Sequence, residues 1–110
     1  MEIETIKKDN TCIVSVKGRM DALSSPEFEK KIDELIEAGE KFFIIDFEKV
    51  DYISSAGLRA ILSSSKKLKK QEGHLLISSL KDNVKKVFDI AGFSSILPIY
   101  ETVNAALENI

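Results

Sequence analysis

Hydrophobic and polar residues alternate near the N-terminus of the chain in a way that predicts a β-hairpin. The alternation is weak over residues 3–7, and a clearer apolar run covers Cys12 to Val16. Asp9 and Asn10 lie between the two segments, and both residue types tolerate the backbone angles of a tight turn. We therefore expect an antiparallel pair of strands at the start of the chain.

Three later apolar runs, at residues 42–47, 74–78 and 96–100, predict further strands. The run F-F-I-I-D-F at 42–47 lacks alternation, which is typical of a strand buried on both faces, and it places Asp46 near the strand's end. Pro98 favours an edge position for the last strand, because proline has no N–H to donate to a neighbouring strand.

Apolar stripes at helical spacing lie between these strands and predict four helices. The first helix is expected to begin at Ser24 or Ser25 and end at Gly39, and the second to begin at Ser54 or Ser55 and end at Gly73. The third should begin at a capping box at residues 79–82 and end at Gly92, and Thr102 should cap the fourth. The order β-β-α-β-α-β-α-β-α predicts one α/β domain over residues 1–110. We expect a mostly parallel sheet with a leading antiparallel hairpin, packed by about four helices.

Composition narrows the class of protein. The net charge of the 110 residues is only −2, so nothing directs the chain to nucleic acid or to an anionic membrane. The longest strongly apolar run, Phe42 to Ile45, is far too short to span a bilayer. Cys12 is the single cysteine, which excludes an internal disulfide and favours a reducing, cytoplasmic location.

The residues needed for common catalytic and cofactor sites are missing. His74 is the only histidine, so neither a zinc site nor a Ser-His-Asp arrangement has support. The phosphate-binding loop and the dinucleotide-binding glycine pattern are both absent. The sequence therefore predicts neither a metal or cofactor site nor an enzyme.

The segment D-Y-I-S-S-A-G-L-R-A, residues 51–60, is the most informative stretch of the chain. One serine suffices to cap a helix, yet two are present. Gly57 in a helix costs about 1 kcal/mol relative to alanine, so close approach by a strand or a partner should offset that cost. A helix N-terminus also stabilises a phosphate, whether bound or covalently attached. A phosphate here would change binding without unfolding the domain.

This segment, together with F-F-I-I-D-F, G-R-M-D at 18–21 and V-K-K-V-F-D-I-A-G-F at 84–93, resembles the STAS domain of bacterial anti-sigma factor antagonists. The resemblance covers nearly the whole chain. It implies a protein that binds an anti-sigma factor and so releases a sigma factor. The anti-sigma factor is also a serine kinase that inactivates the antagonist by phosphorylation, and a phosphatase restores it.

The family motif reads D-S-[ST]-G, with the first hydroxyl residue modified. Alignment on Gly57 makes Ser55 the phosphoacceptor, with Ser54 in reserve, and it puts Ser54 where the family has aspartate. The resemblance implies a partner surface made by the serine loop and a nearby acid, namely Asp21, Ser54, Ser55, Ala56, Gly57 and Leu58. Ser54 is expected to set the helix start, and Ala56 and Gly57 to keep the approach to the hydroxyl open.

Two other functions remain open from the sequence. The same helix N-terminus could serve a STAS module that senses a small ligand or a nucleotide without covalent change. The domain could also be a scaffold within a signalling complex, in which case a negative charge at Ser55 would leave partner binding unchanged.

Overall fold

The structure, a computed structural model, describes all of residues 1–110 and contains a five-stranded sheet with strands in the order β1-β2-β3-β4-β5. The strands are β1 (Glu2–Lys8), β2 (Thr11–Met20), β3 (Phe42–Ile53), β4 (His74–Ser78) and β5 (Ile99–Tyr100). The β1–β2 pair is antiparallel, and every other neighbouring pair is parallel. The predicted α/β fold with a leading antiparallel hairpin is confirmed.

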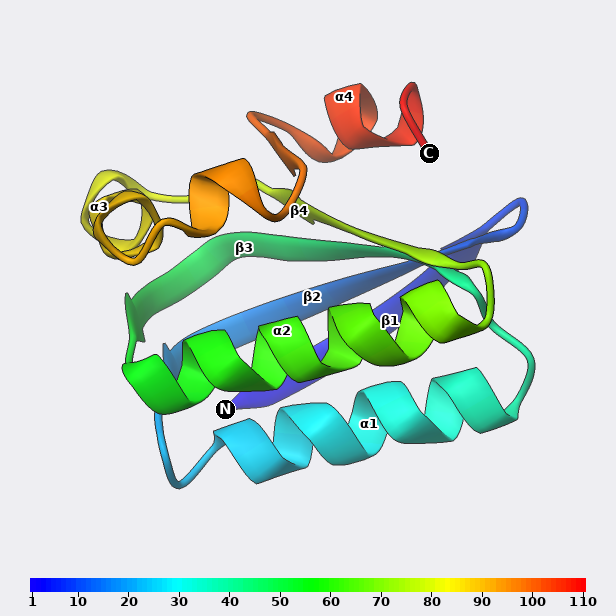
Figure 1. The fold of residues 1–110 in the computed structure, drawn as a ribbon, viewed down its shortest axis with the longest axis horizontal. Helices are drawn as coiled ribbons and strands as arrows, with labels where there is room; N and C mark the ends of the chain where they lie inside the picture. The colour runs from blue at the N-terminus through cyan, green and yellow to red at the C-terminus, as the bar shows by residue number, and fades with distance from the viewer.

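Four α-helices and one short 3-10 helix connect and cover the strands (Figure 1). They are α1 (Ser25–Glu37), α2 (Ser55–Lys70), α3 (Asp82–Ile90), η1 (Phe93–Ser95) and α4 (Val103–Leu107). The helices α1 and α2 lie side by side along one face of the sheet, and α4 lies on the opposite side (Figure 1). None of the helices is both long and apolar enough to cross a membrane.

The main core fills the space between the sheet and α1, α2 and α3. It contains 20 buried residues, with Phe28 of α1, Ile61 of α2 and Phe88 of α3 among them. Phe88 meets Phe47 of β3 edge-to-face at a centroid distance of 5.8 Å. The other face of the sheet carries a cluster of four buried residues, covered by α4: Ile13, Ile44, Leu76 and Ala106. The sheet is therefore thickly covered on one face and thinly covered on the other.

The two central strands are longer than their apolar runs predicted. β2 extends to Met20 and β3 to Ile53, and these two residues are partners in the parallel register. Asp46 consequently lies inside β3 and not near its end. The extension forms because the two strands continue to pair through two register shifts, and such pairing leaves no periodic signal in either strand alone.

The last strand is shorter than expected. It contains only Ile99 and Tyr100, while residues 93–95 form η1. Pro98 directly precedes β5, and its carbonyl accepts a 2.9 Å hydrogen bond from the N–H of Ile77 in β4. The expected edge position is confirmed, since β5 is the outer strand beside β4.

Two predicted helix ends differ in the structure. The capping box at residues 79–82 is wrong, because Ser79 has a left-handed backbone (φ 65°) and the helix begins after Lys81 without a side-chain cap. Gly73 follows α2, but the left-handed residue there is Glu72 (φ 61°). Gly73 is needed for a different reason, because a Cβ at that position would collide with the carbonyl oxygen of Lys41.

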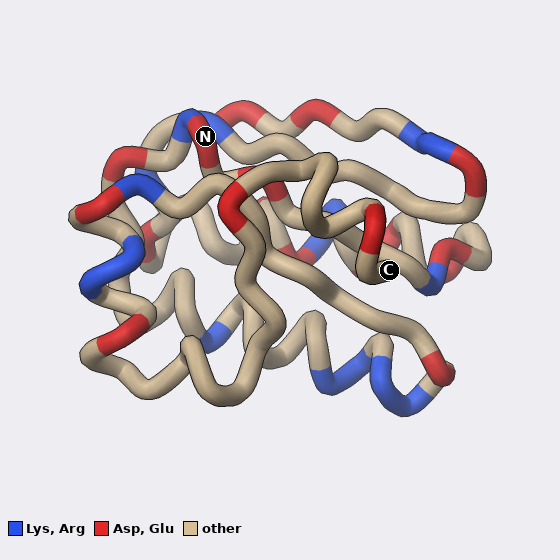
Figure 2. The backbone as a smooth tube through the Cα atoms, turned by 90° about the horizontal axis from the view of Figure 1, so that it is seen from above, with Lys and Arg blue, Asp and Glu red and all other residues tan.

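Acidic and basic residues are interspersed around the molecule (Figure 2). The last turn of α2 is basic, with Lys67, Lys69 and Lys70 near the negative end of the helix dipole. Lys67 also pairs with Asp33 of α1 at 2.9 Å, which joins the two helices on their outer side.

Candidate functional site

The N-terminus of α2 is built by Ser54, which joins the end of β3 to the helix. Its backbone is extended (φ −100°, ψ 175°), and its side chain accepts a 3.3 Å hydrogen bond from the N–H of Gly57. Its own N–H donates to the carbonyl of Met20 at 3.0 Å. The expected capping role of Ser54 is thus confirmed, and the cap is tied to the end of β2.

Ser55 is the first residue of α2, and its side chain is exposed. Its hydroxyl has no hydrogen-bond partner within the protein, in contrast to that of Ser54. The first turn of α2 contains no acidic residue, so no carboxylate there opposes the partial positive charge of the helix N-terminus. The structure therefore presents one of the two serines to the outside and uses the other to start the helix.

Gly57 lies beneath this turn and is buried. A Cβ at Gly57 would lie 2.7 Å from the carbonyl oxygen of Met20 and 2.8 Å from Cγ1 of Ile53. The strand ends of β2 and β3 thus occupy the space that its missing side chain leaves, and Gly57 does not open an approach from outside. Leu58 is also buried, with 5% of its surface exposed. Of the six residues expected at the partner surface, Gly57 and Leu58 are therefore buried and not available for contact from outside.

Asp21 lies in the loop between β2 and α1, directly after Met20. Its Oδ1 accepts hydrogen bonds from the N–H groups of Leu23 and Ser24, both at 3.1 Å. The Ser24 hydroxyl in turn donates to the carbonyl of Arg19 at 2.7 Å. The Ser24 amide, together with the Ser24 hydroxyl, the Leu23 amide and the charge of Arg19, lowers the pKa of Asp21. Asp21 therefore orders this loop, and the bond from Ser54 to Met20 places the loop beside the start of α2.

Three neighbouring residues were missed by the sequence reasoning. The guanidinium carbon of Arg19 lies 4.0 Å from the centroid of the Tyr52 ring, and Nε of Arg19 lies 3.6 Å from Oδ2 of Asp21. Leu23 is 93% exposed although its loop is held by hydrogen bonds. Arg19 and Tyr52 face each other through the β2–β3 register, which no local pattern reveals. Exposed tyrosine and arginine side chains are suited to contact another protein.

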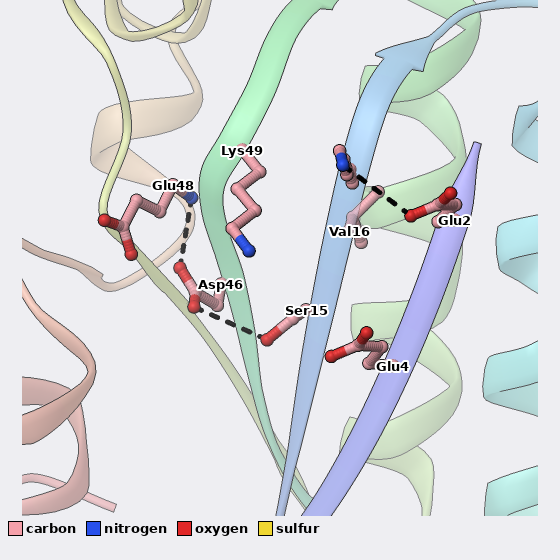
Figure 3. A pocket seen from close by; sticks show the side chains of 8 residues that line it. Glu2, Glu4, Ser15, Val16, Asp46, Glu48 and Lys49 are labelled. Carbon is pink, nitrogen blue, oxygen red and sulfur yellow. Dashed lines mark hydrogen bonds and ion pairs between the residues drawn. The ribbon is translucent and has the colours of Figure 1, made fainter.

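A hollow of about 220 Å³ lies on the thinly covered face of the sheet, around Ser15 and Asp46 (Figure 3). Oδ2 of Asp46 accepts a 3.4 Å hydrogen bond from Ser15, and Oδ1 accepts one of 3.0 Å from the N–H of Glu48. Glu2 and Glu4 from β1 and Lys49 from β3 line the same hollow. No group of histidine, cysteine and carboxylate side chains in the chain is arranged to hold a metal ion.

Comparison with known proteins identifies the family of this chain. Residues 2–106 match the STAS domain family. The BtrV protein of Bordetella bronchiseptica, assigned as an anti-sigma factor antagonist, is 34% identical over 96% of this chain and 91% of its own length. The anti-sigma-B factor antagonist of Staphylococcus aureus is 27% identical over 92% of this chain and 94% of its own.

Solved structures share the fold. Unphosphorylated SpoIIAA, an anti-sigma factor antagonist, superposes with a TM-score of 0.85 at 20% identity, covering 98% of this chain and 95% of the other. The phosphorylated form of the Bacillus protein SpoIIAA superposes with a TM-score of 0.76 at 19% identity, covering 98% of each chain. The matches along nearly the full length establish that this chain belongs to the STAS-domain family of anti-sigma factor antagonists.

Proposed function

We propose that this protein binds an anti-sigma factor through the surface around Ser55 and releases a sigma factor from it. Phosphorylation of Ser55 by the same anti-sigma factor, acting as a serine kinase, switches the binding off, and a phosphatase restores it. The observation that carries the proposal is the division between the two serines. Ser54 is engaged as the helix cap, and Ser55 offers an exposed, unbonded hydroxyl one residue later.

The position of Ser55 supports a switch that leaves the fold intact. A phosphate would add a charge of about −1.5 to −2 at the helix N-terminus, where negative charge is stabilising. Because the hydroxyl is outside the core, its modification needs no repacking of buried residues. The same charge would oppose an apolar or acidic partner surface that covers Ala56 and Leu23. Binding would therefore be lost while the domain stays folded.

The departure from the family motif is compatible with this proposal. Ser54 stands where the family has aspartate, and serine and aspartate are about equally good N-cap residues. The substitution thus keeps the helix start, as the hydrogen bond from Gly57 to Ser54 indicates. It also removes a carboxylate that would repel a phosphate on the next residue. The change at Ala56, where the family has a second hydroxyl, leaves Ser55 as the one exposed hydroxyl of the first turn.

The test is phosphorylation by the anti-sigma factor kinase of the same organism. The purified protein is incubated with that kinase and ATP, and the phosphate is located by mass spectrometry. Wild type and Ser54→Ala are expected to be labelled, and Ser55→Ala is not. Undiminished labelling of Ser55→Ala would reject Ser55 as the acceptor.

The binding half of the proposal is tested separately. The unmodified protein is expected to capture the anti-sigma factor in a pull-down, and the Ser55-phosphorylated protein is expected to lose that capture. A Ser55→Asp variant that retains full binding would instead support the scaffold function. The small-ligand sensor would be supported by tight nucleotide binding in titration calorimetry without any kinase-dependent modification.

A further inference from the structure

We propose that Arg59 holds the phosphate on Ser55 across one turn of α2. This inference rests on the proposed phosphorylation of Ser55 and assigns a role to a residue outside the family motif. Arg59 would act as a positioning residue of the switch, through an ion pair that exists only in the phosphorylated protein.

The spacing of the two residues brings them to the same face of the helix. Ser55 and Arg59 are four positions apart in α2, and both are exposed. Side chains at i and i+4 are neighbours on a helix surface. Long side chains on a helix also point back toward its N-terminus, so that each covers the turn before its own Cα. The turn that Arg59 covers is the one that begins with Ser55.

Arg59 is free to take this partner. It has no hydrogen bond or ion pair in the structure, whereas Arg19, the only other arginine of the chain, is engaged by Asp21 and Tyr52. No acidic residue occurs anywhere in α2. The residues three and four positions before and after Arg59 are all uncharged: Ser55, Ala56, Leu62 and Ser63. Among them, Ser55 lies on the N-terminal side, toward which the arginine side chain points.

The chemistry of the pair favours a close contact. A guanidinium group presents N–H donors in a planar fork that matches two oxygens of a phosphate. The carboxylate of Asp21 is turned into its own loop, where it accepts hydrogen bonds from the Leu23 and Ser24 amides. The phosphate would then be fixed over Ala56 instead of moving freely in solvent. Arg59 would at the same time be withdrawn from any acidic group of a partner.

The experiment uses the full chain with phosphoserine incorporated at position 55 during translation, so that it does not depend on any kinase. The second ionisation of the phosphate is followed by ³¹P NMR. An ion pair of this kind on a helix should lower its apparent pKa in wild type by roughly 0.3 pH unit relative to Arg59→Gln. Arg59→Lys keeps the charge without the fork and should give an intermediate value. Lys66→Gln, which removes an exposed charge farther along α2, should match wild type.

Equal apparent pKa values in wild type and Arg59→Gln would overturn the inference, and so would a shift of the same size in Lys66→Gln. Thermal unfolding supplies a second readout. Phosphorylation should raise the melting temperature more in wild type than in Arg59→Gln, and an equal rise would count against the pair. Failure of the kinase to label Ser55 would reject the proposed function and leave this titration unaffected, so the two failures are distinguishable.

Discussion

The N–H of Ser54 donates a 3.0 Å hydrogen bond to the carbonyl oxygen of Met20. This bond joins the start of α2 to the end of β2, and the loop with Asp21 begins at the next residue. The same carbonyl lies 2.7 Å from the position that a Cβ at Gly57 would take. The loop of Asp21 and the loop of Ser55 are therefore held together at a single peptide group.

Replacement of Gly57 by alanine should destabilise the protein, because the new methyl group would press on the backbone carbonyl of Met20 and on buried side-chain atoms of Met20 and Ile53. A loss of about 1–3 kcal/mol in the free energy of unfolding is expected for such overpacking, even though alanine itself favours a helix. Urea denaturation measures the change. Ser63→Ala, a partly exposed position in the same helix, is the control and should differ little from wild type. A Gly57→Ala protein as stable as wild type would contradict the packing described for Met20.

The two serines should respond differently to removal of their hydroxyls. Ser54→Ala removes the helix cap and should cost about 1 kcal/mol of stability. Ser55→Ala removes a hydroxyl without a partner and should stay within about 0.5 kcal/mol of wild type. Chemical denaturation of the two variants under identical conditions makes the comparison. Equal losses in both would show that the capping role is shared between the two residues.

Asp21 should contribute a pH-dependent part of the stability. The pKa of its carboxyl is lowered in the folded protein, first by the N–H of Ser24. A lowered pKa means that the contribution is fully present above the unfolded value of about 3.9. It is lost as the pH falls through the lower, folded value. The difference in stability between wild type and Asp21→Asn should therefore be constant from pH 7 to about pH 5 and shrink below pH 4. If the difference in stability between wild type and Asp21→Asn does not shrink below pH 4, the role assigned to the Asp21 carboxylate is wrong.

Cys12 should be inert toward thiol reagents in the folded protein. It is 2% exposed on β2, and burial, followed by the nearby Glu40, raises the pKa of its thiol. Both effects lower the amount of reactive thiolate, because only the deprotonated form attacks the reagent. At pH 8 the native protein should give almost no reaction with a disulfide reagent, and the urea-unfolded protein should react with one equivalent. Rapid reaction of the native protein would mean that β2 opens locally.

Local patterns predicted most of the elements correctly. The alternation at the N-terminus, the unbroken apolar run at 42–47 and the helical stripes each depend on residues close in sequence. Ser54 could be recognised as a cap and Thr102 as another, because a cap needs only the residues of one helical turn. The predictions were wrong at the extended ends of β2 and β3, at the shortened last strand and at residues 79–82. In each case the decisive contacts join segments that are distant in the chain.

At the start of α2, too, local sequence predicted the residues of one helical turn but not their contacts with distant segments. Local sequence located the two serines and the small residues after them, and it predicted which serine would start the helix. It did not reveal that Gly57 accommodates Met20, or that Arg19 lies over Tyr52. Both relationships depend on the register between β2 and β3, which is set by strands separated by a whole helix.

The sequence alone therefore determined the order of strands and helices, the fact that they form one α/β fold, and the position of the Ser55 hydroxyl at the start of α2. These follow from periodicity and capping, which act over a few residues. Tertiary structure alone decided how long the central strands are, which strand ends approach Gly57, and that Arg19 lies over Tyr52. Those features follow from strand pairing and close packing between distant segments, and such contacts leave no regular spacing along the chain.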